Sequence, residues 1–170
     1  MGGGDRHLRA LGRVLGDLAE IGYDARWTTI RASDIGAPHH RARVFLIAYP
    51  ADTGCIGLQA ARWGGGYGAK VAGPVGGAGT LPGDGGIYGR YEPVVRRWEQ
   101  VTGTTAPPPT ELNTNGKPQL NIEFASWMMG LPKGWITGVP GLSRAQQLKA
   151  IGNGVVPQQA AAALLLLKGI

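Results

Sequence analysis

The sequence predicts an α/β fold built around part of a mixed sheet, and three patterns near its N-terminus support this. Apolar residues recur at three- and four-residue spacing from Leu8 to Ile21, which gives a helix one apolar face. The next segment, 23–31, is rich in residues that favour strands. The run 43–49 is almost continuously apolar, as in a strand buried on both faces. A helix followed by two such strands indicates a portion of a larger sheet.

Length and composition fit one domain or a large piece of a bigger protein. The 170 residues carry 17 Lys and Arg against 11 Asp and Glu, and this net charge of +6 favours an anionic partner such as nucleic acid. The single cysteine excludes a disulfide framework within the chain. No secretory signal is visible, and the longest apolar run, 160–167, is shorter than the ~20 residues that span a bilayer. We therefore expect a cytoplasmic protein with no membrane partner.

Glycines divide the chain into three parts. Residues 51–90 hold 14 of the 30 glycines, which disfavours a dense core because an ordered glycine loses more backbone entropy than other residues. We expect a long loop or a small irregular domain there, followed by a stiff proline run at 107–109. The predicted organisation is 1–50, a glycine- and proline-rich region over 51–120, and a closing segment over 121–170.

The closing segment is predicted to be helical. Asn121 can cap a short helix that runs to Met129. A second helix is expected over 143–151. Pro157 suits the first turn of a final Ala- and Leu-rich helix that ends near Lys168.

The sharpest local feature is the sequence Gly-Ala-Pro-His-His-Arg-Ala-Arg at 36–43. A proline-fixed turn delivers Arg41 and Arg43 to the start of a predicted strand, where residues two apart share a face. Two guanidinium groups on one face suit a clamp for a phosphate or a carboxylate. Solvated charges at a strand edge are an equally good interpretation of these two residues alone.

No metal site or nucleophile is predicted from His39, His40 and Cys55. Adjacent histidines on an extended chain point in opposite directions, and no further ligand follows at metal-binding spacing. Nothing in the sequence around Cys55 resembles an environment that activates a thiol.

Basic and aromatic residues alternate in and beside the glycine-rich region. The basic ones are Arg62, Lys70, Arg90, Arg96 and Arg97, and the aromatic ones are Trp63, Tyr67, Tyr88, Tyr91 and Trp98. This mixture suits nucleic-acid contact through stacking and phosphate neutralisation. A small satellite core explains the aromatic residues as well.

A second polar feature, Gly-Asn-Gly-Val-Val-Pro at 152–157, lies between two predicted helices. Free backbone N–H groups near a helix start, together with the Asn153 side chain, suit a small anionic or polar group. A plain turn in which Asn153 and Gly154 supply positive φ angles is the simpler interpretation.

In this order, the two polar segments resemble the cytosine-5 DNA methyltransferase family. Residues 36–45 look like its eighth motif, with His39 where the family usually carries glutamine. Residues 147–157 look like its tenth motif, and 124–135 resemble the ninth-motif region of phage and bacterial members. The glycine-rich 51–120 falls where the family has its variable target-recognition domain.

The resemblance implies the C-terminal part of a Rossmann-like, S-adenosylmethionine-dependent methyltransferase sheet, as found in bacterial and phage restriction–modification systems. Arg41 and Arg43 would contact a flipped cytidine and nearby backbone, while Asn153 and Gly154 would line the methyl-donor pocket. The residues that would contact double-stranded DNA are Arg62, Lys70, Arg90, Arg96 and Arg97.

The family's nucleophilic and donor-binding segments have no counterpart in these 170 residues. The sequence contains no Pro-Cys, no Glu-Asn-Val and no Phe-x-Gly-x-Gly loop, and Cys55 follows the eighth motif, outside the family's order. Because covalent catalysis needs that nucleophile, we expect the chain to be inactive alone and to need a separate N-terminal half. The alternative is a non-catalytic DNA-binding module.

Overall fold

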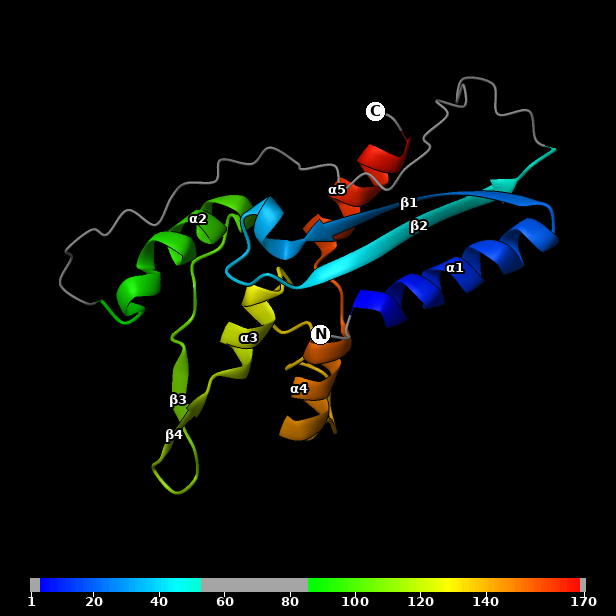
Figure 1. The fold of residues 1–170 in the computed structure, drawn as a ribbon. Coiled ribbons are helices and arrows are strands. Elements are labelled where there is room, and N and C mark those ends of the chain that lie inside the picture. Colours follow the sequence, from blue (N-terminus) through cyan, green and yellow to red (C-terminus); the bar gives the residue numbers. More distant parts are fainter. Residues whose placement is uncertain (1–3, 53–85, 169–170) are drawn as a thin grey trace. The chain divides into compact units, whose positions relative to one another are not determined.

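The computed structural model describes residues 4–52 and 86–168 (Figure 1). Its elements are, in chain order, α1 (Gly4–Glu20), β1 (Tyr23–Arg31), the 3-10 helix η1 (Ala32–Ile35), β2 (Ala42–Pro50), the 3-10 helix η2 (Gly89–Tyr91), α2 (Glu92–Thr102), β3 (Thr110–Leu112), β4 (Pro118–Leu120), α3 (Ile122–Met128), α4 (Arg144–Asn153) and α5 (Pro157–Lys168). The fold is mixed α/β with two small sheets. The chain divides into two compact units; the described residues of the first are 4–29, 44–52 and 163–168, and those of the second are 30–43 and 86–162.

The predicted N-terminal helix and first strand are confirmed. In α1, Leu11, Leu15 and Leu18 are half-buried, as predicted for the apolar face, whereas most of their described neighbours are exposed. Ile21, the last residue of the predicted face, lies beyond the helix and is 68% exposed. Gly22, with a φ of 78°, turns the chain into β1. In the first unit, Arg26 of β1 also donates a hydrogen bond of 3.1 Å to the carbonyl of Leu167 in α5.

β1 and β2 form a two-stranded sheet. The Ala51 amide donates to the Gly22 carbonyl at 2.9 Å beyond one end, and the Ala32 amide donates to the Arg41 carbonyl at 3.3 Å beyond the other. These two hydrogen bonds make the pair antiparallel.

The predicted burial of the second strand on both faces is wrong for the described chain. Every residue of β2 is half-buried or exposed, and Val44 is 50% exposed. Trp27 on β1 is 44% exposed. Burial on both faces requires other elements packed on each face of a sheet, and these exposed side chains show that the described residues do not provide that cover. A Rossmann-like sheet therefore stays a prediction.

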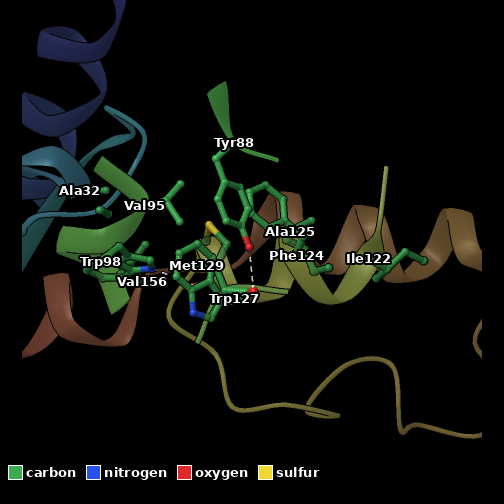
Figure 2. Close-up of a cluster of buried hydrophobic side chains, with 13 residues drawn as sticks. Ala32, Tyr88, Val95, Trp98, Ile122, Phe124, Ala125, Trp127, Met129 and Val156 are labelled. Carbon is green, nitrogen blue, oxygen red and sulfur yellow. Dashed lines mark hydrogen bonds between the residues drawn. The ribbon is translucent and has the colours of Figure 1, made fainter. Parts of the chain in front are cut away.

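The core of the second unit is a cluster of aromatic and aliphatic side chains centred on α2 and α3 (Figure 2). Trp98 of α2 is fully buried, and its Nε1 donates to the Trp127 carbonyl at 3.0 Å. The Phe124 ring stacks on Tyr88, with 6.0 Å between centroids, and on Trp127, with 5.7 Å. The other buried members are Ala32, Ala37, Val95, Ala106, Ile122, Ala125, Met129, Ile151 and Val156.

Residues 86–120 are more regular than the predicted irregular region. They contain α2, whose Trp98 belongs to the same core as Trp127 of α3, so position 120 does not separate two cores. Apolar residues facing α3 outweigh the local glycine content here. The rest of the predicted region, 53–85, lies outside the described residues.

A hairpin of β3 and β4 follows the proline run and was not predicted. Thr110 lies opposite Leu120, and Leu112 lies opposite Pro118. The turn contains Asn115-Gly116, a strong hairpin signal, and Gly116 has a φ of 70°.

The three predicted C-terminal helices are confirmed with shifted ends. The Asn121 side chain accepts a hydrogen bond of 2.9 Å from the Glu123 amide and caps α3. Ser143 caps α4 through a capping box with Gln146. The helix continues through Asn153 rather than stopping at residue 151.

Among the described residues, the stretch Arg144–Lys168 has the length and apolar composition of a membrane-crossing helix. It consists of α4, with 10 residues, and α5, with 12, separated by the non-helical residues 154–156. Each helix alone is shorter than the ~20 residues that a bilayer requires.

Candidate functional site

The second unit contains a pocket of about 270 Å³, which is lined by residues from the segment 36–43 and from the end of α4. Its lining residues are His39, Arg41, Ala125, Met128, Met129, Ile151 and Gly152. Four of these seven side chains are apolar, so the pocket suits a flat or apolar group edged by a few polar atoms.

Arg41 ties the two polar segments together. Its Nη2 donates hydrogen bonds of 2.6 Å to the carbonyls of Gly152 and of Gly154. Carbonyls at the C-terminal end of a helix lack partners within the helix and carry the negative end of its dipole. The Arg41 guanidinium therefore acts as a cationic cap on α4.

The predicted shared face of Arg41 and Arg43 is wrong. Arg41 precedes β2 and has a φ of 21°, which breaks the alternation of a strand. Arg43 is in the strand, and its Nη1 donates to the neighbouring Ala42 carbonyl at 2.9 Å. The two guanidinium groups thus have different partners and do not form a matched clamp. Their contacts with DNA stay a prediction.

His39 anchors the same segment to α3. Its Nε2 lies 3.1 Å from the Met128 carbonyl, so the neutral ring donates from Nε2. Burial is the main cause that lowers the pKa of His39, and the charges of Arg41, His40 and Arg43 lower it further, whereas the Met128 hydrogen bond opposes them. The ring is therefore neutral at pH 7.

Asn153 and Gly154 are arranged differently from the predicted turn. Asn153 is the last residue of α4, with an exposed side chain, and Gly154 has a φ of −65°. Positive φ angles are therefore not the reason for these residues. The Gly154 carbonyl is instead a partner of Arg41, and the Asn153 amide is left accessible to a ligand.

The predicted DNA-contacting residues differ in their surroundings. Arg62 and Lys70 lie outside the described residues. Arg90 is exposed; it donates to the Tyr91 hydroxyl at 2.8 Å and lies over the Tyr91 ring. Arg97 on α2 is exposed.

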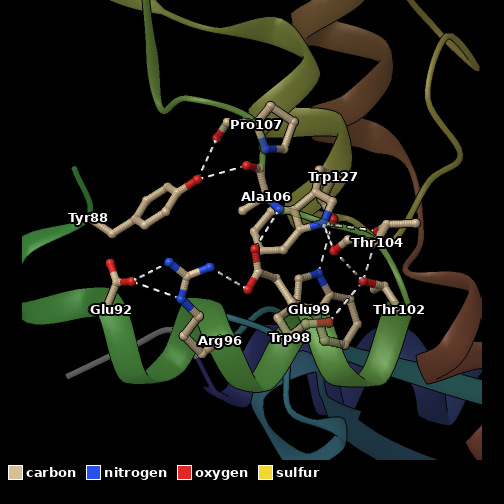
Figure 3. Close-up of polar contacts among 10 residues, drawn as sticks. All are labelled: Tyr88, Glu92, Arg96, Trp98, Glu99, Thr102, Thr104, Ala106, Pro107 and Trp127. Atoms are coloured by element: carbon tan, nitrogen blue, oxygen red, sulfur yellow. Dashed lines mark hydrogen bonds and ion pairs between the residues drawn. The ribbon is translucent and has the colours of Figure 1, made fainter. Parts of the chain in front are cut away.

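Arg96 is engaged with carboxylates on its own helix (Figure 3). It pairs with Glu92 at 2.7 Å and with Glu99 at 2.8 Å. These hydrogen bonds, first that of Glu99 and then that of Glu92, raise the pKa of Arg96. The two neighbouring carboxylates compete with a phosphate for Arg96, and its contact with DNA stays a prediction.

Two of the predicted stacking aromatics are core residues. Tyr88 is buried, and its hydroxyl donates to the Ala106 carbonyl at 2.8 Å (Figure 3). Burial raises the pKa of Tyr88, so the hydroxyl keeps its proton. Trp98 is fully buried, whereas Tyr91 is 58% exposed. Trp63 and Tyr67 lie outside the described residues.

Gln159 does not line the pocket but bonds to the backbone of Arg41, which does, and this contact was not predicted. It is fully buried in α5, and its Nε2 donates to the carbonyls of Ile30 at 2.6 Å and Arg41 at 2.9 Å. A glutamine in an Ala-rich helix gives no local signal of this role, because both partners lie more than 100 residues away.

Comparison with known proteins gives a family match over part of the chain. No curated protein and no solved structure matches the chain. Residues 4–62 match the family model described as C-5 cytosine-specific DNA methylase. The match contains Arg41 and Arg43, while α4 and its C-terminal end lie outside it. The segment that forms one side of the pocket is therefore similar to C-5 cytosine-specific DNA methylases.

Proposed function

We propose that this chain is the C-terminal part of a DNA (cytosine-5-)methyltransferase, which transfers a methyl group from S-adenosylmethionine to cytosine in double-stranded DNA. One observation carries the proposal. Arg41, inside the family match, bonds to the carbonyls of Gly152 and Gly154, which belong to the second segment that resembles the family. Two segments separated by more than 100 residues thus meet at one pocket.

We propose a role for each of the two segments that meet at the pocket. Arg43 lies at the start of β2 and contacts the target cytidine or the nearby backbone through charge-assisted hydrogen bonds. Asn153 and Gly154 bind the methyl donor at the end of α4. The exposed Asn153 amide fits this task because it can both donate and accept hydrogen bonds. S-adenosylmethionine, when bound, supplies the methyl group.

The nucleophile belongs to another polypeptide segment. The attacking cysteine, the glutamate that steadies the ring and the donor-binding loop are absent from the 170 residues. We propose that a separate N-terminal half supplies them, and that this chain contributes DNA contacts. Its net charge of +6 and the exposed Arg90, Tyr91 and Arg97 support contact with a phosphate backbone.

Methyl transfer by a reconstituted enzyme tests the proposal. The chain is mixed with the N-terminal half of a cytosine-5 methyltransferase that ends before the segment corresponding to α1, and tritiated donor and duplex DNA are added. We expect incorporation only when both parts are present, with a large loss for Arg43→Ala. Tight DNA binding without incorporation, whichever half is supplied, would favour the non-catalytic module. Incorporation by the chain alone would contradict the proposal that a separate N-terminal half supplies the nucleophile and the donor-binding loop.

A further inference from the structure

Gln159 is a polar side chain with no access to solvent in the second unit. Its exposed fraction is 0%, which is rare for glutamine. Its two amide hydrogens are used by the carbonyls of Ile30 and Arg41. The amide oxygen, Oε1, is buried without a hydrogen-bond partner among the described residues. The two bonds of Nε2 are therefore what offsets the cost of burying this side chain.

The two carbonyls lie on either side of the loop that connects β1 to β2. Ile30 is near the end of β1, and Arg41 directly precedes β2. The Ala32 amide also donates to the Arg41 carbonyl, at 3.3 Å, and to the His40 carbonyl, at 2.8 Å. Gln159 therefore closes the base of this loop.

The backbone of Arg41 needs such support. A φ of 21° is unfavourable for a residue other than glycine and persists only where surrounding contacts impose it. Gln159 and Ala32 supply contacts at its carbonyl. The Arg41 side chain leaves this backbone toward the end of α4, where Nη2 has two carbonyl partners.

One nitrogen of the Arg41 guanidinium, Nη2, is bonded to the chain itself. Besides the two bonds of Nη2, its Nε is buried and has no hydrogen-bond partner among the described residues. A ligand that took the place of the two carbonyls at Nη2 would remove the cap on α4. Among the described residues, the Arg43 guanidinium bonds only to the adjacent Ala42 carbonyl. Because this hydrogen bond is exposed, Arg43 can exchange it for one to another acceptor.

We propose that Gln159 is a positioning residue, which holds the Arg41 backbone so that the guanidinium stays on α4 and Arg43 is the arginine of the pair that meets a ligand. Only the identity of that ligand, DNA, rests on the proposed function. The positioning itself is a property of the chain without DNA.

Nitrogen-15 NMR of the full chain tests the positioning directly. In the wild type we expect the Arg41 Hη protons to give separate, slowly exchanging signals, because two carbonyls hinder rotation of the guanidinium. Gln159→Met keeps the length of the side chain and removes both donors. At a temperature where this variant is folded by circular dichroism, we expect the Arg41 signals to merge and the Ala32 amide to exchange about tenfold faster or more.

Gln158→Met is the matched control, because Gln158 is the neighbouring residue of α5 but donates to the Gly130 carbonyl, at 3.3 Å. It should leave the Arg41 signals unchanged, as should Arg43→Ala. A merely stabilising role of Gln159 would lower the melting temperature without altering Arg41 in the folded variant. Unchanged Arg41 signals in folded Gln159→Met would overturn the proposal.

A measurement on the wild type covers the case in which Gln159→Met does not fold. Under mildly denaturing conditions, the Gln159 side-chain amide and the Arg41 guanidinium should exchange through one opening event of the same free energy. Openings of different free energy would overturn the proposal. Because no step uses DNA, a chain that shows this coupling but no DNA binding would contradict only the proposed function.

Discussion

His39 performs a contact that a glutamine could also make. It lies where the resemblance to the methyltransferase family places glutamine, and its Nε2 donates to the Met128 carbonyl. A glutamine amide also carries N–H donors, so the hydrogen bond does not require a histidine. What the histidine adds is sensitivity to pH.

We expect the free energy of unfolding to decrease as the pH falls below about 6.5. Burial lowers the pKa of His39 in the folded chain, so the unfolded chain binds a proton first and is favoured. The stability from neutral His39 is thus complete above the unfolded pKa and is lost below it. Urea unfolding at pH 7.5 and pH 5.5 measures the effect.

His39→Gln should weaken this pH dependence while keeping the donor, and His40→Gln should retain it. His40 is exposed and contacts Ser33, so it serves as the neighbouring control. The same pH dependence in His39→Gln as in the wild type would show that His39 is not its source.

Tyr88→Phe separates a core residue from a DNA-stacking residue. The change leaves the buried Ala106 carbonyl without the Tyr88 donor, and a lost buried partner costs about 1–3 kcal/mol of stability. DNA affinity should stay within experimental error, because the ring is buried. Thermal unfolding and fluorescence anisotropy measure the two effects, with Tyr91→Phe as the exposed control. A loss of DNA affinity in folded Tyr88→Phe would contradict this assignment.

At the scale of elements, α2 combines a buried and a charged face. Val95 and Trp98 face the core, whereas Arg96 forms ion pairs along the helix with Glu92 and Glu99. Glu99 also accepts from the Ala106 amide at 2.8 Å, and this hydrogen bond is the first cause of its lowered pKa, followed by that with Arg96. Arg96 therefore orders the helix end rather than offering a free charge.

Arg97→Gln should weaken DNA binding more than Arg96→Gln. A free arginine that neutralises one phosphate contributes about one unit to the slope of log K against log salt concentration, and an arginine held by two carboxylates contributes less. Anisotropy titrations at several salt concentrations give both slopes. Equal losses of slope at the two positions would mean that the ion pairs open on DNA.

At the scale of the whole molecule, several large apolar side chains of the first unit are exposed. Val14 of α1 is 48% exposed, Trp27 of β1 44%, Val44 of β2 50% and Leu165 of α5 54%. Exposed apolar groups of this size are typical of interaction surfaces or of sites of aggregation. The proposed N-terminal half would give them a partner.

We expect the chain alone to bind a hydrophobic dye such as anilinonaphthalene sulfonate, and to lose this signal when the N-terminal half is added. Its melting temperature should rise with the concentration of that half, because a partner that binds only the folded state stabilises it. Combined Trp27→Thr and Val44→Thr substitutions should reduce the dye signal. If an N-terminal half restores methyl transfer but leaves the dye signal unchanged, the dye binds outside the surface that this half covers.

Local signals in the sequence predicted α1, the first two strands and the three C-terminal helices, whereas α2, the β3–β4 hairpin and the distant contacts escaped prediction. The Asn121 cap, the start of α5 at Pro157 and the α1 stripe depend on neighbours within a few residues. The sequence overestimates the burial of β2 because an apolar run does not show what packs on each face of the strand. The bonds of Arg41 and Gln159 join residues more than 100 positions apart, and no local pattern encodes such pairs.

The hydrogen bond from Gln159 to the Arg41 carbonyl also affects when this loop can fold during synthesis of the chain. A ribosome that adds about 5–20 residues per second makes Gln159 roughly 6–24 seconds after Arg41, across the 118 positions between them. Through nearly all of that interval, the Arg41 carbonyl lacks the Gln159 donor and the Arg41 side chain lacks the two carbonyls of the α4 end. The loop between the first two strands therefore acquires its final form only after Gln159 has been made, and a nascent chain stalled before that point would lack these contacts.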